Sequence, residues 1–316
     1  MMESKVNTLV IGGAGYIGFH LVQLLVATDR NVTVLGRSAL PKYVLPPQSN
    51  YVAGDFGEAE LISELLDKNQ EVIHLAYATV PNTSYENPLA DLLQNLPPTV
   101  QLFSIAAQKG VRLVLVSSGG TVYGESVNLP ICETHPVKPI SPYGLTKLTL
   151  ESYAYLYAKT HGLDFVCVRP ANAYGVGQRP FVGQGFIATA MASVMQNKPI
   201  PIFGKQGAVR DYLYVSDLAS GIVSALRFGQ KSETYNLGSG IGVSNTDIIE
   251  AFEPLMSEIG CTAQLEYLPE RAFDVKTNIL DSSKLMQHSG WQPKIEFADG
   301  LGLTFEWLKA QNYERR

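Results

Sequence analysis

A tyrosine and a lysine stand at positions i and i+4 in the segment Tyr143-Gly144-Leu145-Thr146-Lys147. On a helix these positions share a face, so the phenol and the ammonium can converge on one site. A lysine ammonium near a phenol stabilises the phenolate and lowers the phenol pKa from about 10 toward neutrality. A tyrosine tuned in this way can exchange a proton with a substrate hydroxyl while a hydride moves. Tyr143 and Lys147 therefore predict a proton-transfer site, and Lys147 can also contact a cofactor ribose.

A glycine-rich segment near the N-terminus has the spacing G-x-x-G-x-x-G, at Gly12, Gly15 and Gly18. It follows the apolar run 8–11, a predicted buried strand, and opens a predicted helix over 16–28. Glycines allow a tight turn and a close backbone approach to a pyrophosphate, and the helix N-terminus supplies amide donors. We therefore expect this loop, including Tyr16 and Ile17, to bind a dinucleotide. A glycine turn without a ligand is the alternative.

The residues after the predicted second strand, 31–35, bear on which dinucleotide binds. Folds specific for NAD place an Asp or Glu there, on the ribose 2′-hydroxyl. This chain has Gly36-Arg37-Ser38 instead. Gly36 removes the carboxylate, and Arg37 with Ser38 could hold a 2′-phosphate. The segment favours NADP over NAD, unless Arg37 only stacks on the adenine or faces solvent.

Short apolar runs alternate with helical stretches through the first half of the chain. Strands are predicted over 8–11, 31–35, 51–53, 71–76, 112–117 and 164–169. Helices are predicted over 16–28, 60–68, 91–108 with an interruption at Pro97-Pro98, and 143–161. This alternation predicts an α/β fold with a doubly wound parallel sheet of the Rossmann type. We expect residues 1–173 to form the dinucleotide-binding domain, which also receives roughly 209–238, and residues 174–316 to form a smaller, interleaved C-terminal substrate lobe.

The composition excludes some classes of partner. The chain has 316 residues, a formal net charge of −5 and no run of Lys or Arg. We therefore expect neither nucleic acid nor a membrane as a partner. The cysteines number three and are widely spaced, which predicts neither a disulfide framework nor a metal site. The first apolar run is too short for a signal or membrane-spanning segment, so a cytoplasmic protein is expected.

The glycine loop and the Tyr143–Lys147 pair carry a family resemblance that extends from end to end of the chain. The sequence resembles the extended short-chain dehydrogenases/reductases of the UDP-galactose 4-epimerase and nucleotide-sugar epimerase-dehydratase group. The matching segments are GGAGYIG at 12–18, GDF at 54–56, HLA at 74–76, SSGGTVYG at 117–124, SPYGLTK at 141–147, RPANAYG at 169–175, VRDYLYVSDLA at 209–219, YNLGSG at 235–240, 271–274 and 280–281.

The resemblance implies roles for individual residues. Tyr143 would be the catalytic acid/base and Lys147 its partner. Asp55 would contact the adenine, and further cofactor contacts would come from Phe56, Leu75, Ala76 and Asn95. The nucleotide-sugar diphosphate and base would be lined by Asn172, Arg179, Arg210, Arg271 and Asp274. Guanidinium groups suit diphosphate oxygens, although a surface ion pair is the alternative for Arg210 and Arg271.

One position departs from the family pattern. The family's third catalytic residue, a Ser or Thr, falls at Gly119 when counted back from Tyr123. We predict that Ser118 or Thr121 assists instead, the alternative being that both are packing and turn residues. Asn278 stands where some members carry a bulky tyrosine near the sugar, which predicts a larger pocket that tolerates N-acetylated sugars.

The resemblance implies a UDP-hexose 4-epimerase that oxidises the sugar transiently at C4. The Gly36-Arg37-Ser38 segment favours the alternative, an NADPH-dependent 4-ketoreductase of a nucleotide-linked 4-keto-6-deoxysugar. A dehydratase is disfavoured because Gly120 and Thr121 stand where acidic residues are wanted. A non-catalytic dinucleotide sensor is a further alternative that only Gly119 supports. Family resemblance also implies a homodimer formed through helices that include 143–161.

Overall fold

A seven-stranded parallel sheet forms the centre of the larger part of the molecule, in the order β10-β6-β5-β4-β1-β2-β3. The computed structural model describes residues 5–28, 30–126, 128–271 and 275–311. The strands of this sheet are β1 (Asn7–Ile11), β2 (Asn31–Gly36), β3 (Ser49–Ala53), β4 (Glu71–His74), β5 (Arg112–Val116), β6 (Phe165–Pro170) and β10 (Thr234–Leu237). The predicted Rossmann sheet is confirmed, and its order reverses between β1 and β4.

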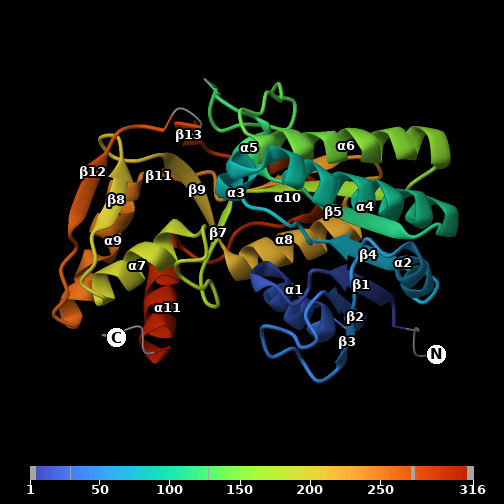
Figure 1. The fold of residues 1–316 in the computed structure, drawn as a ribbon, viewed down its shortest axis with the longest axis horizontal. Coiled ribbons are helices and arrows are strands. Elements are labelled where there is room, and N and C mark those ends of the chain that lie inside the picture. The colour runs from blue at the N-terminus through green and yellow to red at the C-terminus, as the bar shows by residue number, and fades with distance from the viewer. Residues whose placement is uncertain (1–4, 29, 127, 272–274, 312–316) are drawn as a thin grey trace.

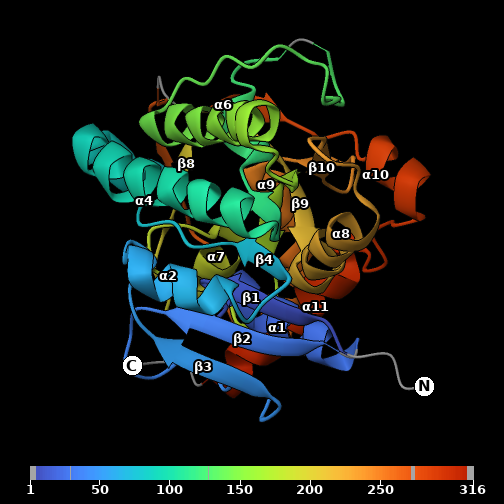
Figure 2. The same cartoon turned by 90° about the vertical axis from the view of Figure 1, so that its right-hand side faces the viewer.

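Helices cover both faces of this sheet (Figures 1 and 2). They are α1 (Tyr16–Ala27), α2 (Ala59–Leu66), α3 (Pro81–Glu86), α4 (Pro88–Lys109), α5 (Gly119–Val122), α6 (Pro142–His161), α8 (Val215–Phe228) and α10 (Ser283–Ser289). Successive side chains of a strand point to opposite faces, so Val10 packs with α1 and α8 while Leu9 and Ile11 pack with α2, α4 and α6. Burial on both faces explains why these strands are continuously apolar.

A smaller group of elements lies beside the carboxyl ends of the large sheet, at the left of Figure 1. Its strands are β7 (Asn172–Tyr174), β8 (Ile200–Phe203), β9 (Val209–Tyr214), β11 (Gly242–Val243), β12 (Leu265–Leu268) and β13 (Thr277–Asn278). Its helices are α7 (Phe186–Met195), α9 (Asn245–Glu258) and α11 (Phe297–Ala310). Strand β9 pairs with β7, β11 and β13, whereas the following α8 and β10 return to the large sheet. The chain therefore crosses between the two groups more than once.

Helix α4 differs from the prediction, because it runs without interruption through Pro97 and Pro98. The missing proline N–H groups free the carbonyls of Leu93 and Gln94, which lie on the exposed face of the helix where water can satisfy them. The opposite face carries buried Phe103, which helps to hold the helix against the sheet. Tertiary packing therefore overrides the local breaking signal.

Candidate active site

The glycine loop makes a tight passage between β1 and α1. Gly12 has a φ of +86°, and a Cβ there would lie 2.8 Å from the backbone nitrogen of Ala76. A Cβ on Gly18 would collide with the backbone of Gly12 and Gly13. Helix α1 begins after Gly15, whose position supplies no side-chain cap. The open N–H groups of the first helical turn therefore remain available to an anion such as a pyrophosphate.

A cavity of about 1030 Å³ extends from this loop across the carboxyl ends of the large sheet into the smaller group of elements. Its lining combines the glycine loop, the ends of β5 and β6, the start of α6, and the segments 203–210 and 275–277 with Glu270 and Arg271. Pockets for one small ligand usually measure about 300–1000 Å³. This cavity lies at the upper end of that range.

Tyr143 and Lys147 both line this cavity from the first turns of α6. The helix starts cleanly because Pro142 occupies its first position and the Ser141 hydroxyl accepts the Gly144 N–H at 3.1 Å. Lys147 is only 5% exposed, and its ammonium donates to the Val116 carbonyl at 2.8 Å. The ammonium lies 5.7 Å from the centre of the Tyr143 ring. The predicted convergence of the two side chains is therefore present.

The electrostatics of the pair differ from the prediction. Burial raises the pKa of the Tyr143 phenol well above its usual value, and the nearby Asp91 carboxylate raises it further. Burial also lowers the pKa of Lys147 to about 8. The prediction that Lys147 draws the pKa of Tyr143 toward neutrality is wrong. A buried phenol is harder to ionise than an exposed one, and burial is the largest influence on the pKa of Tyr143.

Hydroxyl groups surround the space next to this pair. Ser118 and Thr121, the two predicted assistants, both line the cavity. The Thr121 hydroxyl is buried and has no hydrogen-bond partner among the described residues. Ser117 differs, because its hydroxyl donates to the Glu151 carboxylate behind the strand end. Thr121 is thus free to bind a ligand oxygen, and Ser117 is already engaged.

Gly119 has a structural reason for lacking a side chain. A Cβ there would collide with Leu280 and lie 2.8 Å from the Arg169 carbonyl oxygen. Asn278 is 1% exposed and donates to the Gly119 carbonyl at 3.0 Å. The amide points to this turn and is absent from the cavity lining, and the prediction that the small Asn278 side chain leaves a larger sugar pocket stays a prediction. A buried amide that finds a backbone acceptor gains more than one turned into open space.

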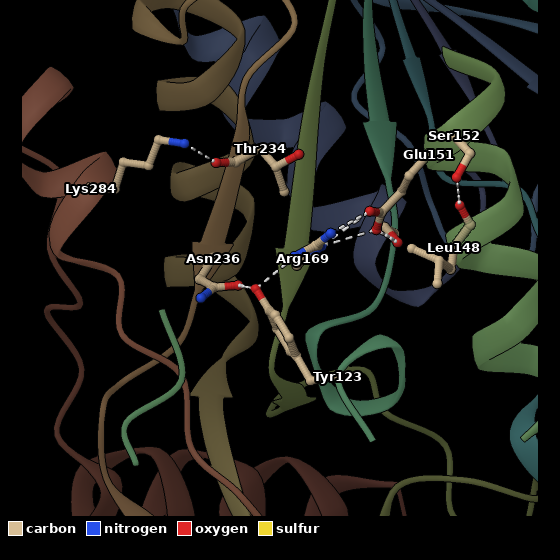
Figure 3. Close-up of polar contacts among 9 residues, drawn as sticks. Tyr123, Leu148, Glu151, Ser152, Arg169, Thr234, Asn236 and Lys284 are labelled. Atoms are coloured by element: carbon tan, nitrogen blue, oxygen red, sulfur yellow. Dashed lines mark hydrogen bonds and ion pairs between the residues drawn. The ribbon is translucent and has the colours of Figure 1, made fainter. Parts of the chain in front are cut away.

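A buried polar network joins α6, β6 and β10 (Figure 3). Glu151, one helical turn after Lys147, forms an ion pair with Arg169 of β6 at 2.6 Å. Arg169 also donates to the Tyr123 hydroxyl at 2.9 Å, which in turn donates to the Asn236 side chain at 2.7 Å. Sequence reasoning missed this network. The network ties α6 to β6 and to β10, and so fixes the helix that carries Tyr143 and Lys147.

The predicted cofactor residues fall into two groups. Those that line the cavity are Gly12, Gly15, Tyr16, Ile17, Gly18, Leu75 and Lys147. Those outside the lining are Arg37, Ser38, Asp55, Phe56, Ala76 and Asn95. Arg37 and Ser38 follow β2 while Asp55 follows β3, so they lie at the same edge of the sheet as the glycine loop. Their assignment to the adenosine end of a cofactor stays a prediction.

Two of the residues outside the lining have definite structural contacts. Phe56 is buried, with its ring 5.1 Å from that of His74. The Asn95 side chain accepts the Ala78 N–H at 2.8 Å. Asn95 therefore holds the loop after β4 in place, and in this arrangement its side chain does not reach into the cavity.

The predicted substrate residues are also divided. Asn172, Arg210 and Arg271 line the cavity, and the Arg271 guanidinium lies 3.9 Å from the centre of the Phe203 ring. Arg179 lies elsewhere, where it donates to the Lys42 carbonyl at 3.1 Å. Asp274 lies outside the described residues. The cavity thus has a cationic wall formed by Arg210 of β9 and by Arg271, which follows β12.

Sequence reasoning placed Gln178 in a substrate-lobe loop, 178–180, but gave no individual role to it or to Tyr77, and both line the cavity. The Tyr77 ring packs edge-on against Tyr143, with ring centres 4.8 Å apart. The Gln178 side-chain carbonyl is buried and has no partner among the described residues. Tyr77 directly follows the HLA segment and Gln178 directly precedes Arg179. No spacing rule distinguishes these residues from their neighbours before the fold is known.

Two broader properties concern the described residues only. None of their helices is long and apolar enough to cross a membrane. They contain no group of three or more His, Cys, Asp or Glu residues that could hold a metal ion.

Comparisons with known proteins define the class. A family profile described as "NAD dependent epimerase/dehydratase family" matches residues 8–238. The chain belongs to this family, and it is a nicotinamide-dependent enzyme of nucleotide sugars. The residues present fit such a cofactor, since the glycine loop is shaped for close approach and the first turn of α1 offers free N–H groups.

Solved structures and a curated relative agree with the family. A UDP-glucose 4-epimerase from Thermotoga maritima, solved with UDP-glucose, is 30% identical with a TM-score of 0.90, covering 97% of this chain and 99% of that one. The Thermus thermophilus UDP-glucose 4-epimerase in complex with NAD is 32% identical with a TM-score of 0.88, covering 96% and 99%. An Escherichia coli dTDP-4-dehydro-6-deoxyglucose reductase is 30% identical, covering 98% of this chain and 100% of the relative.

Proposed function

We propose that the protein is a nucleotide-diphosphate-sugar 4-epimerase of the UDP-hexose type. One observation carries the proposal: Tyr143, Lys147 and the unpartnered Thr121 hydroxyl line the same cavity as the glycine loop and the cationic wall. A hydride carrier on the loop and a diphosphate on the arginines would thus face each other across the proton-transfer group. The similarity to two UDP-glucose 4-epimerases supports this choice.

The residues suggest a division of work during turnover. When bound, the nicotinamide supplies reversible hydride acceptance at C4 of the sugar. Tyr143 would take the proton from the C4 hydroxyl and later return it. Lys147 would donate to the cofactor ribose and favour the tyrosinate, while Ser118 or Thr121 would orient the sugar oxygen. Arg210 and Arg271, with Asn172 beside them, would bind the diphosphate and base.

The remaining cofactor and domain assignments are part of the proposal. Gly12, Gly15 and Gly18, with Tyr16 and Ile17, would hold the pyrophosphate, and Asp55 the adenine. Residues 1–173 with roughly 209–238 would bind the dinucleotide, and residues 174–316 would bind most of the substrate. Strand β9 is the exception within 209–238, because it pairs with β13 in the smaller group of elements, and these two strands carry Arg210 and Thr277 into the cavity wall.

We further propose NADP as the preferred cofactor. A Cβ on Gly36 would lie 2.8 Å from the Tyr51 hydroxyl, and this hydroxyl donates to the Ser38 carbonyl at 2.6 Å. The space where a ribose-binding carboxylate would stand is therefore occupied by a phenol. Arg37 is exposed at the strand end, where its guanidinium can pair with a 2′-phosphate.

A specific set of observations favours a second candidate, the NADPH-dependent 4-ketoreductase. A ketoreductase needs a protonated acid to give a proton to the new alkoxide, and the raised pKa of Tyr143 keeps that proton on the phenol. The strand end at Gly36 and Arg37 and the similarity to the E. coli reductase point the same way. The non-catalytic sensor finds no comparable support, since the family consists of enzymes.

One set of assays separates the two enzymes. The purified protein is incubated with UDP-galactose without added reductant, and in parallel with a dTDP-4-keto-6-deoxysugar and NADPH. The epimerase proposal predicts UDP-glucose in the first reaction and tightly bound cofactor in the purified protein. Consumption of NADPH in the second reaction only would establish the reductase instead. Tyr143→Phe serves as the inactive control in both.

A homodimer through α4 and α6 is also proposed. The two helices lie side by side on the outer face (Figures 1 and 2), and they expose apolar side chains that include Leu89 at 63%, Leu93 at 57% and Leu156 at 48%. Apolar surface of this kind is usually covered by a partner. Light scattering should give twice the chain mass for the wild type, and the monomer mass for Leu93→Glu/Leu156→Glu.

A further inference from the structure

A buried carboxylate, Asp91 of α4, lies behind the proposed catalytic pair. Its side chain is 0% exposed. It takes part in none of the ion pairs formed within the described part of the chain. The Thr79 hydroxyl donates to one of its oxygens, and the Tyr77 hydroxyl lies 3.5 Å from the other. A buried carboxylate held only by hydroxyl groups is costly, so its surroundings are expected to make use of its charge.

Helix α4 fastens the loop after β4 at several points. Asp91 binds Thr79 and approaches Tyr77, while the Asn95 side chain accepts the Ala78 N–H at 2.8 Å. The Asn95 amide also donates to the Asp91 carbonyl at 2.7 Å, which links the two anchors. Three consecutive loop residues are thereby held against the helix. The position of the Tyr77 ring is consequently set by α4.

The Tyr77 ring contacts both members of the proposed pair. The Lys147 ammonium lies 4.0 Å from the ring centre, a cation–π distance. The Tyr143 ring lies 4.8 Å away at an interplanar angle of 67°, an edge-to-face arrangement. Tyr77 thus stands between the anchored loop and the two groups proposed to move protons.

We propose that Asp91 is a positioning residue of the Tyr143–Lys147 pair, acting through the Tyr77 ring that it helps to orient and through its own negative charge. The inference rests on the proposed function, because it assigns Asp91 to a pair whose catalytic role is itself proposed. The negative charge raises the pKa of both Tyr143 and Lys147. For Lys147 this opposes the effect of burial, in the same direction as the larger contributions of Cys167 and Glu151.

Other titratable or charged groups also face Lys147 and can influence its pKa. They are Tyr143 and Glu151 on α6, His74 on β4, Tyr77 after β4, Asp91 on α4 and Cys167 on β6. Burial, with Lys147 nearby, lowers the pKa of His74 to about 3, so this ring is neutral. Glu151 is already paired with Arg169. Asp91 is therefore the carboxylate whose charge is not offset by a cation of its own within the described structure.

The test uses the dependence of stability on pH. Lys147 has a pKa of about 8 in the folded protein and an ordinary value of about 10.4 when unfolded. Between these values the unfolded chain binds more protons, so the free energy of unfolding rises with pH. Subtracting the curve for Lys147→Met from the wild-type curve isolates this contribution. Removing the Asp91 charge lowers the folded pKa further, so the rise should begin at a lower pH.

The experiment compares urea unfolding from pH 6 to pH 10 for wild type, Lys147→Met, Asp91→Asn and the Asp91→Asn/Lys147→Met double variant. We expect the Lys147 contribution to the free energy of unfolding to begin its rise about one pH unit lower in the Asp91→Asn background than in the wild-type background. Coincident curves in the two backgrounds would overturn the inference.

Two variants of Tyr77 keep the test decisive if Asp91→Asn does not fold. Tyr77→Phe retains the ring. In this variant the Lys147 contribution to the free energy of unfolding should begin to rise at the same pH as in the wild type. Tyr77→Leu removes the ring and should move that rise to lower pH, because the cation–π contact is lost. Equal behaviour of Tyr77→Leu and wild type would refute the route through the ring.

A catalytic readout separates failure of the inference from failure of the proposed function. The basic limb of kcat/KM for UDP-galactose should move to lower pH in Asp91→Asn, whereas a purely structural residue would change only the amplitude. A wild type that turns over neither UDP-galactose nor a 4-keto sugar would defeat the proposed function. The unfolding experiment would still decide the inference.

Discussion

Helix α6 carries two buried charged side chains one turn apart, Glu151 and Lys147, and their surroundings differ. The carboxylate of Glu151 accepts from Ser117 and is paired with Arg169, whose guanidinium continues to Tyr123 (Figure 3). Lys147 faces the cavity, has a carbonyl and two aromatic rings beside it, and has a lowered pKa. A buried charge with a full set of partners holds structure, whereas one without a paired charge becomes easy to titrate.

The largest expected effect comes from Tyr143, which lines the cavity together with Lys147. Tyr143→Phe should lower kcat by about 10²- to 10⁴-fold, because the proton-transfer group is lost. Binding of NADP should persist, since the glycine loop is untouched, and fluorescence titration checks this. Tyr153→Phe, on an exposed part of the same helix, is the matched control and should keep full activity. Wild-type rates in Tyr143→Phe would place the chemistry elsewhere.

Substitutions in the Glu151–Arg169 network should change the stability of the fold. Arg169→Met leaves the Glu151 carboxylate buried without its cation, which should cost about 3–5 kcal/mol in the free energy of unfolding. Urea unfolding measures it. The double variant Glu151→Leu/Arg169→Met should recover much of the loss, because no uncompensated charge remains. A loss below about 1 kcal/mol in Arg169→Met would mean that the network is not what fixes α6.

Gly119 lies between the cavity and the Glu151–Arg169 network. Its replacement should have a moderate effect on stability. Gly119→Ser restores the family's hydroxyl, yet its Cβ would collide with Leu280 and approach the Arg169 carbonyl. We expect a loss of about 1–3 kcal/mol and no gain in kcat. Gly302→Ala, in α11, is the control, since its Cβ would meet no atom within 4 Å. A faster and equally stable Gly119→Ser would show that the family arrangement fits after all.

The smallest expected effect is on the pH dependence of kcat/KM, through the charge of Lys147. Since the pKa of Lys147 is about 8, the fraction of charged lysine falls above that pH, and kcat/KM should fall with it. Lys147→Arg retains the charge to higher pH, so any remaining activity should lose this basic limb. A wild-type profile that stays flat to pH 10 would indicate that the charge of Lys147 is not required.

Local patterns predicted the parts of the molecule that depend on neighbouring residues. The strand, glycine turn and helix at 8–28 and the Tyr143–Lys147 spacing follow from short-range rules, and the structure contains them. Contacts between distant segments could not be predicted in this way. Asn278 binds Gly119, 159 residues away, and α4 passes through Pro97 because its far face is packed. The raised pKa of Tyr143 likewise depends on burial, which spacing does not report.

The most direct measurement of the central claim follows a deuterium at C4. UDP-galactose deuterated at C4 is incubated with the purified protein without added reductant, and the products are examined by NMR. Epimerisation at C4 within the cavity predicts UDP-glucose that keeps its deuterium at C4, because the hydride that leaves the carbon returns to it. Absence of UDP-glucose, or UDP-glucose with the deuterium lost to solvent, would contradict the account.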